Sequence, residues 1–568
     1  MSSVFVLAQL NFTVGDFTGN LQKIRQVLVD AGDVDWVVFT ELALSGYYPM
    51  DLLNLPAFQA AYDEAVRALC ALSETTTARI VVGAVTRNDG KGKPFHNSLL
   101  VVHRGKVSLR YHKQLLPTYD VFDEYRHFEP GPVEQSGVWR EQGQPVVGFL
   151  VCEDIWNMEQ GDYVHDPVSH LFSHHPDIDI LVSIHASPAN ECKVDTRHAM
   201  LSQLAARHGA SVVYVNQVGG ADALVFDGAS MVVNRHGALV ARAPSYEESV
   251  QRVKHDHGRW TNAQPMAPVL TGPALWHRHL VLGLRDYFRK TGPGFGKALV
   301  GSSGGIDSAV VLVLAAHALG PENVIALTMP STYSSEGSVA DSQDLCRRLG
   351  VVLHQVPIQG MVDAFQSTMT NVGLGPWSGL ALENAQARAR AVTLMGWANQ
   401  WGALVLTTGN KSEVATGYGT LYGDMAGAIN PLGDLYKTEV YALAEWLNEQ
   451  AIRTTGEEII PSVILTKAPS AELAPGQKDE DSLPPYPVLD AILRFVIEGD
   501  VLEEAQYAQA LAVVQAHPVQ YEDMLKKLQA AEFKRRQAPP ILRVHQRAFG
   551  AGWQVPLAQQ FKDWKYHG

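Results

Sequence analysis

Short apolar runs alternate with amphipathic stretches along the first half of the chain. Apolar runs bounded by turn-forming residues are typical of buried strands, and apolar positions three and four residues apart are typical of helices. The expected strands are Val4–Leu10, Trp36–Phe39, Arg79–Ala84, Asn97–His103, Val146–Val151, Ile180–His185 and Val212–Gln217, and the expected helices are Asn20–Ala31, Ala57–Ser73 and Asp195–Gly209. This alternation predicts an α/β domain.

A polar stretch with scattered prolines, Glu247 to Pro273, interrupts the pattern, and we place a domain boundary there. A second α/β pattern follows. Its expected strands are Lys297–Gly301, Val324–Met329, Val351–Pro357 and Ala403–Thr407, with an apolar helix at Ser308–Leu319, a loop at Ala468–Pro487 and mostly helix from Val488 onward. The sequence thus predicts one domain over residues 1–260, a linker over residues 261–275 and a second domain over residues 276–568.

Composition narrows the class of protein. A chain of 568 residues with 46% hydrophobic residues is long enough for at least two large cores. The net charge of −14 argues against a nucleic-acid partner. The four cysteines, at positions 70, 152, 192 and 346, show no CxxC spacing, which favours a reducing, cytoplasmic location. No apolar run reaches membrane-spanning length, so no membrane association is expected.

Cys152 is a candidate nucleophile, because it ends the apolar run Pro145–Val151 and precedes an acidic pair. A thiol becomes a useful nucleophile only when a base or a positive field promotes its thiolate. Two other segments offer such groups. Glu41 directly follows one buried strand, and Lys113, in Tyr111–Pro117, follows another.

In this order and in these contexts, Glu41, Lys113 and Cys152 resemble the nitrilase superfamily of carbon–nitrogen hydrolases. The resemblance implies an αββα sandwich in which Glu41 is the general base, Lys113 stabilises the oxyanion and Cys152 forms a thioester. It also implies that Glu124 supports Lys113 as a second acid. By the same resemblance, glutamine is held by three residues: Tyr119, Ser187 and Lys193.

Each of these residues also has a structural interpretation when taken singly. Cys152 fits a buried core cysteine, Glu41 a strand-end cap and Lys113 a surface charge. Lys193 fits an exposed lysine at a helix start equally well. The three catalytic candidates together, with their flanking residues, favour the functional interpretation.

A glycine-rich loop joins the first strand of the second domain to its apolar helix. It reads Gly301-Ser302-Ser303-Gly304-Gly305-Ile306-Asp307-Ser308. Glycines let backbone N–H groups approach phosphate oxygens, and the helix N-terminus favours negative charge. The lysine of a Walker A loop is absent. The loop is similar instead to the PP-loop of ATP pyrophosphatases, which implies ATP binding with release of pyrophosphate and a role for Asp307 in holding Mg²⁺; a simple glycine-rich turn is the alternative.

Seven further segments identify the family more narrowly. They are Met329–Ser335, Glu383–Arg388, Leu406–Glu413, Gly417–Asp424, Leu432–Thr438, Pro469–Leu473 and Glu532–Pro540. In this order they resemble NAD⁺ synthetases, and nearly the whole chain therefore resembles the glutamine-dependent NAD⁺ synthetase family. The resemblance implies a Rossmann-like PP-loop ATP pyrophosphatase domain with a parallel sheet in the second half.

The resemblance also implies binding roles. ATP would be bound by residues 301–308 with Thr408 and Lys437, Mg²⁺ by Asp307 and Glu413, and deamido-NAD⁺ by Asn384, Glu413 and Lys534. Leu421 and Ala428 stand where ammonia-only members carry a lysine and an aspartate, so no nicotinate contacts are assigned there. The segment Glu532–Pro540 also fits a solvated charge run.

The implied reaction is the ATP-dependent amidation of deamido-NAD⁺ to NAD⁺ with ammonia from L-glutamine, through an adenylated carboxylate. We expect an internal ammonia tunnel and a homo-oligomer, at least a dimer. Three alternatives stay open: a synthetase whose nitrilase-like domain hydrolyses another amide, a PP-loop enzyme that modifies tRNA, and a silent N-terminal interaction platform.

Overall fold

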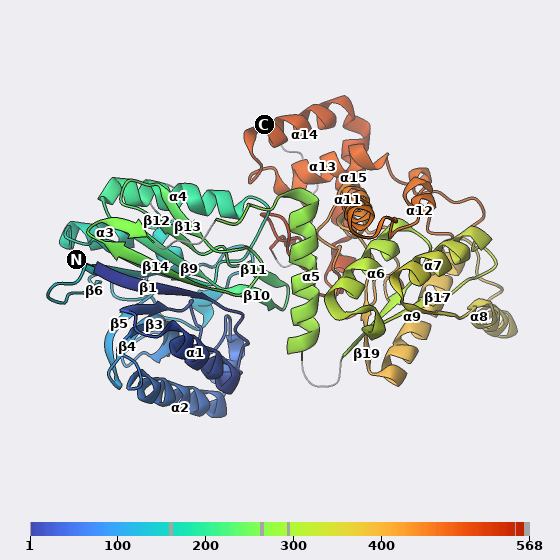
Figure 1. Ribbon diagram of the computed structural model, residues 1–568. Helices are drawn as coiled ribbons and strands as arrows, with labels where there is room; N and C mark the ends of the chain where they lie inside the picture. Colours follow the sequence, from blue (N-terminus) through green and yellow to red (C-terminus); the bar gives the residue numbers. More distant parts are fainter. Residues whose placement is uncertain (1, 158–162, 262–265, 292–295, 551, 562–568) are drawn as a thin grey trace. The chain divides into compact units, whose positions relative to one another are not determined.

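The computed structural model describes residues 2–157, 163–261, 266–291, 296–550 and 552–561. The chain divides into two compact units, Met1–Leu270 and Thr271–Gly568 (Figure 1). Among the described residues, no helix has both the length and the apolar character that a membrane crossing requires.

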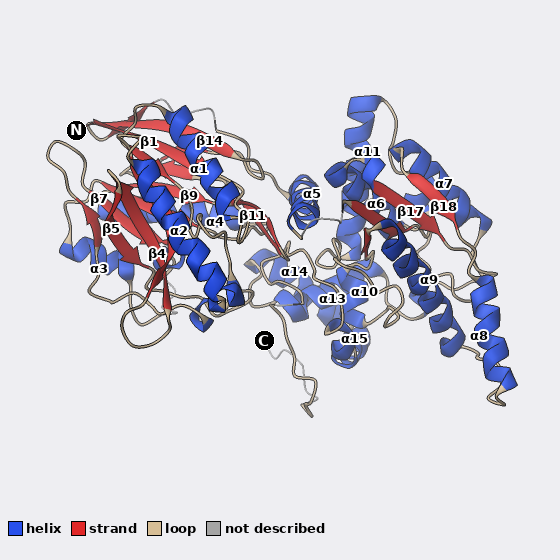
Figure 2. Cartoon of the chain, turned by 90° about the horizontal axis from the view of Figure 1, so that it is seen from below, coloured by secondary structure: helices blue, strands red, loops and turns tan. Residues whose placement is uncertain are grey.

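Two sheets packed face to face form the centre of the first unit (Figures 1 and 2). The seven-stranded sheet has the order β15-β14-β1-β2-β3-β4-β5, and the six-stranded sheet has the order β13-β12-β9-β8-β7-β6. The bounds are β1 Ser2–Gln9, β2 Trp36–Val38, β3 Arg79–Arg87, β4 Phe95–His103, β5 Lys106–His112, β6 Gly137–Trp139, β7 Val147–Val151, β8 Ile180–His185, β9 Ser211–Asn216, β12 Met231–Val233, β13 Leu239–Arg242, β14 Ser249–Asp256 and β15 Arg259–Thr261. A separate hairpin joins β10 (Val218–Ala221) to β11 (Leu224–Asp227).

Helices cover the outer face of each sheet. The helices α1 (Phe17–Ala31) and α2 (Pro56–Ser73) belong to the first sheet, and α3 (Pro167–His174) and α4 (Lys193–His208) to the second (Figure 2). Alternate side chains of β1 therefore enter two cores: Phe5 and Leu7 pack between the sheets, and Val6 and Ala8 pack beneath the helices. Burial on both faces explains the continuous apolar runs, and the predicted αββα sandwich is confirmed.

Three strands of the first sheet differ from the sequence prediction. Glu247–Pro273 was expected to be irregular, but β14 and β15 lie within it, and β14 pairs antiparallel along the whole of β1. The sequence of β14, SVQRVKHD, has no apolar run, and of its residues only Gln251, Val253 and His255 are buried. The edge strand β5 was expected only as a buried strand before Lys113 and was given no bounds, since its outer side chains face solvent. Residues 262–265 of the expected linker lie outside the described residues.

A parallel sheet of four strands forms the centre of the second unit, in the order β18-β17-β16-β19. The bounds are β16 Lys297–Gly301, β17 Val324–Thr328, β18 Val352–Gln355 and β19 Ala403–Leu406. The first strand in sequence, β16, lies between the second strand, β17, and the fourth strand, β19. The chain therefore adds strands first on one side of β16 and later on its other side. Open α/β sheets bind ligands at such a switch point, beyond the carboxyl ends of the strands. The predicted Rossmann-like architecture is confirmed.

Helices surround this sheet and continue beyond it. The bounds are α5 Gly272–Lys290, α6 Ile306–Leu319, α7 Glu336–Leu349, α8 Gln359–Asn371, α9 Leu380–Trp401, α10 Lys411–Thr416, α11 Lys437–Thr455, α12 Ser462–Thr466, α13 Tyr486–Glu498, α14 Glu504–Ala516, α15 Pro518–Ala530 and α16 Glu532–Arg535. The helix α6 is buried almost all round, because the sheet packs on it and α5 and α11 pack on it as well. The helix α5 begins inside the expected linker.

The described residues beyond α16 are irregular, although mostly helix was expected there, and they extend the edge of the sheet. The Ala428 N–H donates to the Val405 carbonyl at 2.8 Å, and the Asn430 N–H donates to the Pro540 carbonyl at 2.8 Å. The C-terminal segment is therefore an integral part of the second unit.

Candidate functional site

Glu41 and Lys113 meet in the interior of the first unit. The Lys113 Nζ lies 2.8 Å from Glu41 Oε1 and 2.8 Å from Glu124 Oε1. The side chains of Lys113 and Glu41 are 0% exposed, so the interpretation of Lys113 as a surface charge is wrong. Lys113 directly follows β5, and Glu41 lies three residues beyond the end of β2 in the same sheet. Their backbones are fixed by the Lys113 N–H, which donates to the Asn97 carbonyl, and the Glu41 N–H, which donates to the His185 carbonyl.

Hydrogen bonds fix the two carboxylates. Asn97 Nδ2 donates to Glu41 Oε1 at 2.7 Å, the Ala186 N–H donates to Glu41 Oε2 at 2.8 Å, and Tyr47 Oη donates to Glu124 Oε1 at 2.8 Å. Burial alone would lower the pKa of Lys113, but the carboxylates of Glu124 and Glu41 raise it well above its usual value. Lys113 therefore remains a fixed cation at neutral pH.

Cys152 follows β7 directly and starts a short 3₁₀ turn, Cys152–Ile155. Its φ of 45° lies in the left-handed region, which is costly for a residue with a side chain. Burial raises the pKa of its thiol well above the usual value, the Glu41 carboxylate raises it further, and Lys113 opposes the shift. The group thus holds a neutral thiol within electrostatic range of a carboxylate and an ammonium. Such an arrangement can transfer a proton from sulfur to carboxylate.

Asp154 ties the Lys113 segment to the Cys152 turn. Its Oδ1 accepts from the N–H groups of Gln114 and Leu115, each at 2.9 Å, and its Oδ2 accepts from Tyr111 Oη at 3.0 Å. Burial raises the pKa of this carboxyl to about 7. The acidic pair after Cys152 is visible in the sequence, but its function is not, because the contacts join segments distant in sequence.

The three residues expected to hold glutamine lie around the same group. Tyr119 Oη donates to Glu153 Oε1 at 3.0 Å, beside Cys152 in sequence. Lys193 starts α4, and its Nζ lies 3.9 Å from the centre of the Trp156 ring. Ser187 is buried after β8, and its Oγ accepts from Arg197 Nη2 at 3.2 Å. Arg197 itself pairs with Asp227 at 2.7 Å.

A cavity of about 270 Å³ opens at the carboxyl ends of β16 and β19 in the second unit. Most residues expected to bind ATP or metal line it: Gly301, Ser302, Ser303, Gly305, Ile306, Asp307, Ser308, Thr408, Glu413 and Lys437. Gly304, Asn384 and Lys534 do not line it. The switch point of the sheet thus brings two loops together that are about 100 residues apart in the sequence.

Gly304 shapes the loop without lining the cavity. Its φ is 75°, and a Cβ there would lie 2.4 Å from the Ser338 carbonyl oxygen, so only glycine fits. Ser303 N–H donates to Ser308 Oγ at 3.2 Å and closes the loop on itself at the start of α6. The strand–loop–helix arrangement expected for a phosphate-binding loop is present.

Asp307, Glu413 and Lys437 form a charged group in the cavity. The Lys437 ammonium contacts the Asp307 carboxylate and lies 3.6 Å from Glu413 Oε1. Asn410 Nδ2 also donates to Asp307 Oδ1 at 2.9 Å. Burial and the neighbouring Asp307 raise the pKa of Glu413 to about 8. Two carboxylates beside one lysine can bind a cation, and carboxylate oxygens are ligands that Mg²⁺ prefers.

Asn384 and Lys534 border the loop that follows α10. Asn384 Oδ1 accepts from Thr420 Oγ1 at 2.7 Å. Lys534 Nζ donates to the carbonyls of Gly417 and Gly419 at 2.8 and 2.7 Å. The interpretation of Lys534 as a solvated charge does not fit these contacts. Both side chains are held by the segment that leads from Glu413 to Asp424.

Several charged residues of the cavity were not predicted from the sequence. Five acids line it against three bases: Asp307, Glu413, Asp424, Glu472 and Asp479 against Arg390, Lys437 and Lys467. The lining therefore carries a net charge of −2 when all are ionised. Only the acidic character of residues 468–487 was visible in the sequence, since the fold brings that loop to β16.

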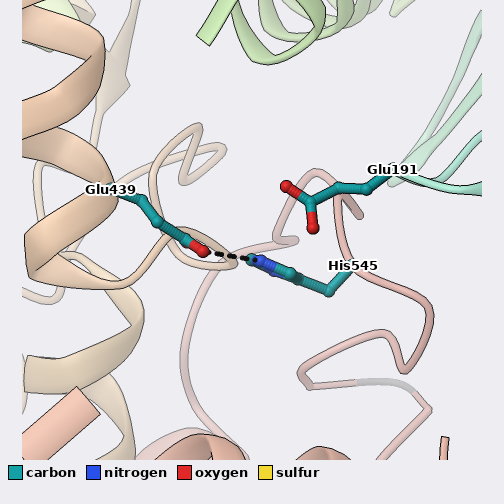
Figure 3. A group of neighbouring side chains, drawn as sticks. All are labelled: Glu191, Glu439 and His545. Carbon is teal, nitrogen blue, oxygen red and sulfur yellow. Dashed lines mark hydrogen bonds and ion pairs between the residues drawn. The ribbon is translucent and has the colours of Figure 1, made fainter. Parts of the chain in front are cut away.

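A buried cluster of charges lies outside the cavity and holds two helices that carry cavity residues. Lys411 Nζ lies 2.9 Å from Asp434 Oδ1 and 2.6 Å from Glu498 Oε1. His545 Nε2 lies 3.1 Å from Glu439 Oε1 (Figure 3), and Arg494 pairs with the same carboxylate. With His545 protonated, three cations balance three anions. Lys411 and Glu439 belong to α10 and α11, the helices that also carry Glu413 and Lys437.

Comparison with known proteins gives matches over nearly the whole chain. The family description "Carbon-nitrogen hydrolase" matches residues 7–264, and "NAD synthase" matches residues 276–538. The glutamine-dependent NAD(+) synthetases of Synechocystis sp. and Thermotoga maritima are 40% and 37% identical, each over 98% of both chains. The solved structure of glutamine-dependent NAD+ synthetase from Acinetobacter baumannii, in complex with ADP, is 34% identical over 98% of both chains, with a TM-score of 0.75.

Replacing His545 tests the buried cluster. Burial lowers the pKa of His545, but the Glu439 carboxylate outweighs it, so the pKa lies well above its usual 6.5. We expect His545→Gln to destabilise the second unit by about 3–5 kcal/mol near pH 6, because an uncompensated buried carboxylate remains. Since the folded pKa is raised, this contribution is complete below about pH 6.5 and is lost as the pH rises through the folded pKa.

Urea denaturation at several pH values measures this effect. The half-exposed His517 provides the matched control, as His517→Gln removes an imidazole outside the cluster. The double variant His545→Gln/Glu439→Gln removes one charge of each sign and should recover part of the lost stability. Equal stability of His545→Gln and wild type would contradict a charged His545.

Proposed function

This chain belongs to the family of glutamine-dependent NAD(+) synthetases, and we propose that it converts deamido-NAD⁺ to NAD⁺ with ammonia from L-glutamine. ATP is consumed, and AMP, pyrophosphate and glutamate are released. Residues 1–260 act as the glutaminase and residues 276–568 as the synthetase, joined by residues 261–275. One observation carries the proposal: a single chain holds a buried Glu–Lys–Cys group and a separate PP-loop cavity.

The first reaction forms and hydrolyses a thioester on Cys152. Glu41 takes the thiol proton, and the thiolate attacks the carboxamide carbon of glutamine. The ammonium of Lys113 stabilises the oxyanion that develops on the amide oxygen. The carbon–nitrogen bond then breaks, and the leaving nitrogen takes the proton from Glu41 and departs as ammonia. Water activated by Glu41 hydrolyses the thioester to glutamate and restores the thiol.

The structure supports this division of roles on electrostatic grounds. The high thiol pKa calls for a base in place, and Glu41 is the carboxylate whose position is fixed by Asn97 and Ala186. Lys113 cannot serve as the base, because two carboxylates keep it protonated. Three residues around Cys152 bind the α-amino and α-carboxylate groups of glutamine: Tyr119, Ser187 and Lys193.

The second reaction takes place in the PP-loop cavity. A carboxylate oxygen of deamido-NAD⁺ attacks the α-phosphorus of ATP, and the bond to the β-phosphate bridge breaks to release pyrophosphate. Residues 301–308 and Thr408 hold the triphosphate, and Lys437 neutralises the leaving pyrophosphate. Ammonia then attacks the acyl carbon, loses a proton and displaces AMP. Glu413, with Asn384 and Lys534 bordering the adjoining loop, binds deamido-NAD⁺.

Mg²⁺ fits the charges of the cavity. Its lining has a net charge of −2 when all its acids are ionised, and a triphosphate adds about four more negative charges. Asp307 and Glu413 offer hard oxygen ligands, and the divalent ion would screen the phosphate charge and polarise the α-phosphorus. The solved Acinetobacter baumannii relative holds ADP, which supports an adenine nucleotide as ligand.

The chain acts as a homo-oligomer, at least a dimer. The helix α9 supports this part of the proposal, because it exposes large apolar side chains along its length. They include Leu380, Val392, Met395 and Trp397, which are 71, 59, 45 and 37% exposed.

Replacing Cys152 separates the two reactions. We expect Cys152→Ala to lower NAD⁺ formation from glutamine by about a thousandfold or more, because no thioester can form. NAD⁺ formation from ammonium chloride should stay at the wild-type rate, since the synthetase cavity is unchanged. NAD⁺ is measured after incubation with ATP, Mg²⁺ and deamido-NAD⁺. Equal loss with both nitrogen sources would contradict two independent sites, and no NAD⁺ from wild type with either source would overturn the proposed function.

Replacing Glu124 tests the support of Lys113. Glu124→Gln keeps the side-chain shape but removes one of the two negative charges that hold the Lys113 ammonium. We expect the rate of glutamine hydrolysis to fall by about 100-fold, because the oxyanion-stabilising cation is less well fixed. Glutamate release measures this rate. Glu134→Gln, an exposed change of the same charge, is the control, and equal rates for the two variants would contradict the assigned role of Glu124.

A further inference from the structure

A second cavity lies in the first unit, outside the Glu–Lys–Cys group. It has a volume of about 390 Å³ and lies between α2 and the facing strands β3, β4 and β5. None of Glu41, Lys113 and Cys152 lines it, and the proposed reaction gives it no role. Protein interiors leave few voids larger than a water molecule, whereas small-molecule sites measure about 300–1,000 Å³. The volume therefore indicates a binding site.

The packing of α2 on the first sheet explains where the cavity opens (Figure 2). In the second half of the helix, Leu69 and Ser73 are 0% exposed and pack closely on their surroundings. In the first half, Phe58 and Val66 are only half-buried, and they line the cavity. The space beneath this half of α2 is thus left unfilled by the protein's own side chains.

Apolar side chains form the wall of the cavity. Three come from α2 and three from the facing strands: Phe58, Tyr62, Val66, Val85, Phe95 and Leu100. The three from the strands are at most 5% exposed, so they form a preformed floor. Half of the six side chains are aromatic, and aromatic rings stack on one another or meet edge to face. Such a wall suits a ligand with an aromatic body.

Charged side chains surround the mouth of the cavity. Three arginines line it against two aspartates, which gives a net charge of +1: Arg67, Arg87 and Arg110 against Asp63 and Asp89. Arg87 Nη2 lies 3.1 Å from Asp63 Oδ2, so these two charges balance each other. The guanidinium groups of Arg67 and Arg110 have no ion-pair or hydrogen-bond partner among the described residues. On a chain with a net charge of −14, this mouth is a local positive site.

Arg110 brings this positive charge to the apolar wall. It lies directly opposite Leu100 in the pairing of β4 with β5, so both side chains are on the face that α2 covers. Burial raises the pKa of Tyr62, and the Arg110 guanidinium opposes that rise. The guanidinium is therefore within electrostatic range of the Tyr62 hydroxyl, beside the aromatic part of the wall. From there it can pair with an anion whose apolar part fills the cavity.

We propose that this cavity binds a small organic anion, an aromatic body carrying one carboxylate, and that Arg110 holds the carboxylate. A net charge of +1 matches a carboxylate better than a phosphate, which carries about −1.5 to −2 at neutral pH. The inference is independent of the proposed function, because none of the cavity residues takes part in either reaction.

Three probes that share one body and differ in charge test the inference: 4-phenylbutanoate, 4-phenylbutan-1-ol and 4-phenylbutylamine. Their affinities for the full-length chain are measured by isothermal titration calorimetry. We expect the acid to bind at least about tenfold more tightly than the alcohol, and the amine to bind most weakly, because Arg110 attracts a carboxylate and repels an ammonium. Equal affinities for the three probes would show a nonspecific apolar surface and overturn the inference, as would no binding of the acid.

Replacing Arg110 tests its contact with the carboxylate. Arg110→Gln removes the cation at an exposed position of an edge strand, so the fold should be retained. We expect the affinity for 4-phenylbutanoate to fall by about tenfold and the affinity for the alcohol to stay the same. Arg104→Gln, an exposed arginine in the turn between β4 and β5 that does not line the cavity, is the matched control. An unchanged affinity of Arg110→Gln for the acid contradicts the role of Arg110.

Two further variants locate the bound probe. Val66→Trp fills the cavity from α2, so it should weaken the binding of both the acid and the alcohol without lowering the melting temperature. Undiminished binding would place the probes elsewhere and overturn the inference. Cys152→Ala cannot hydrolyse glutamine, and 4-phenylbutanoate should bind to it equally with and without L-glutamine. Competition would place the probe at the Glu–Lys–Cys group instead. Failure of the proposed function would leave all these binding results unchanged, since none of them requires either reaction.

Discussion

Neutralisation of buried charge is the constraint on which the rest of the structure depends. Lys113 is 0% exposed, and such an ammonium is tolerable only because Glu41 and Glu124 lie 2.8 Å from it. That requirement fixes the position of Glu41 against the segment that carries both Lys113 and Glu124, although Glu41 and Lys113 are 72 residues apart in sequence. The same requirement holds the C-terminal segment in the second unit, because His545 supplies the third positive charge of a cluster with three acids.

The balance of charge distinguishes supporting groups from reactive ones. The cluster around Lys411 is balanced, three against three, and none of its acids or bases lines the cavity. The group around Lys113 has an excess of one negative charge, which matches a carboxylate that must accept a proton from Cys152. When all its acids are ionised, the PP-loop cavity has an excess of two negative charges, which matches a divalent cation. An unbalanced buried site is costly in the free protein, and its ligand or substrate removes that cost.

Local patterns in the sequence predicted those strands and loops whose structure depends on residues adjacent in the sequence. Lys297–Gly301 was placed residue for residue, and the PP-loop between it and α6 was recognised from its glycines. The strand β14 was missed, because a half-exposed strand alternates and lacks an apolar run. Arg390 and Asp479 were missed as cavity residues for another reason. The acidic loop around Asp479 was visible in the sequence, but no local pattern shows that it meets the PP-loop; only the strand order brings both segments to β16.

The strand order also explains why the end of the chain matters to the nucleotide site. With β16 and β19 adjacent, the sheet continues from β19 through Asn430 to Pro540. This addition places Val544 and His545 so that their N–H groups donate to Asp434 at 2.7 and 2.9 Å. Asp434 in turn holds Lys411, two residues before Glu413. A change at the C-terminal segment therefore reaches the cavity through one carboxylate, by altering where α10 begins rather than by touching a ligand.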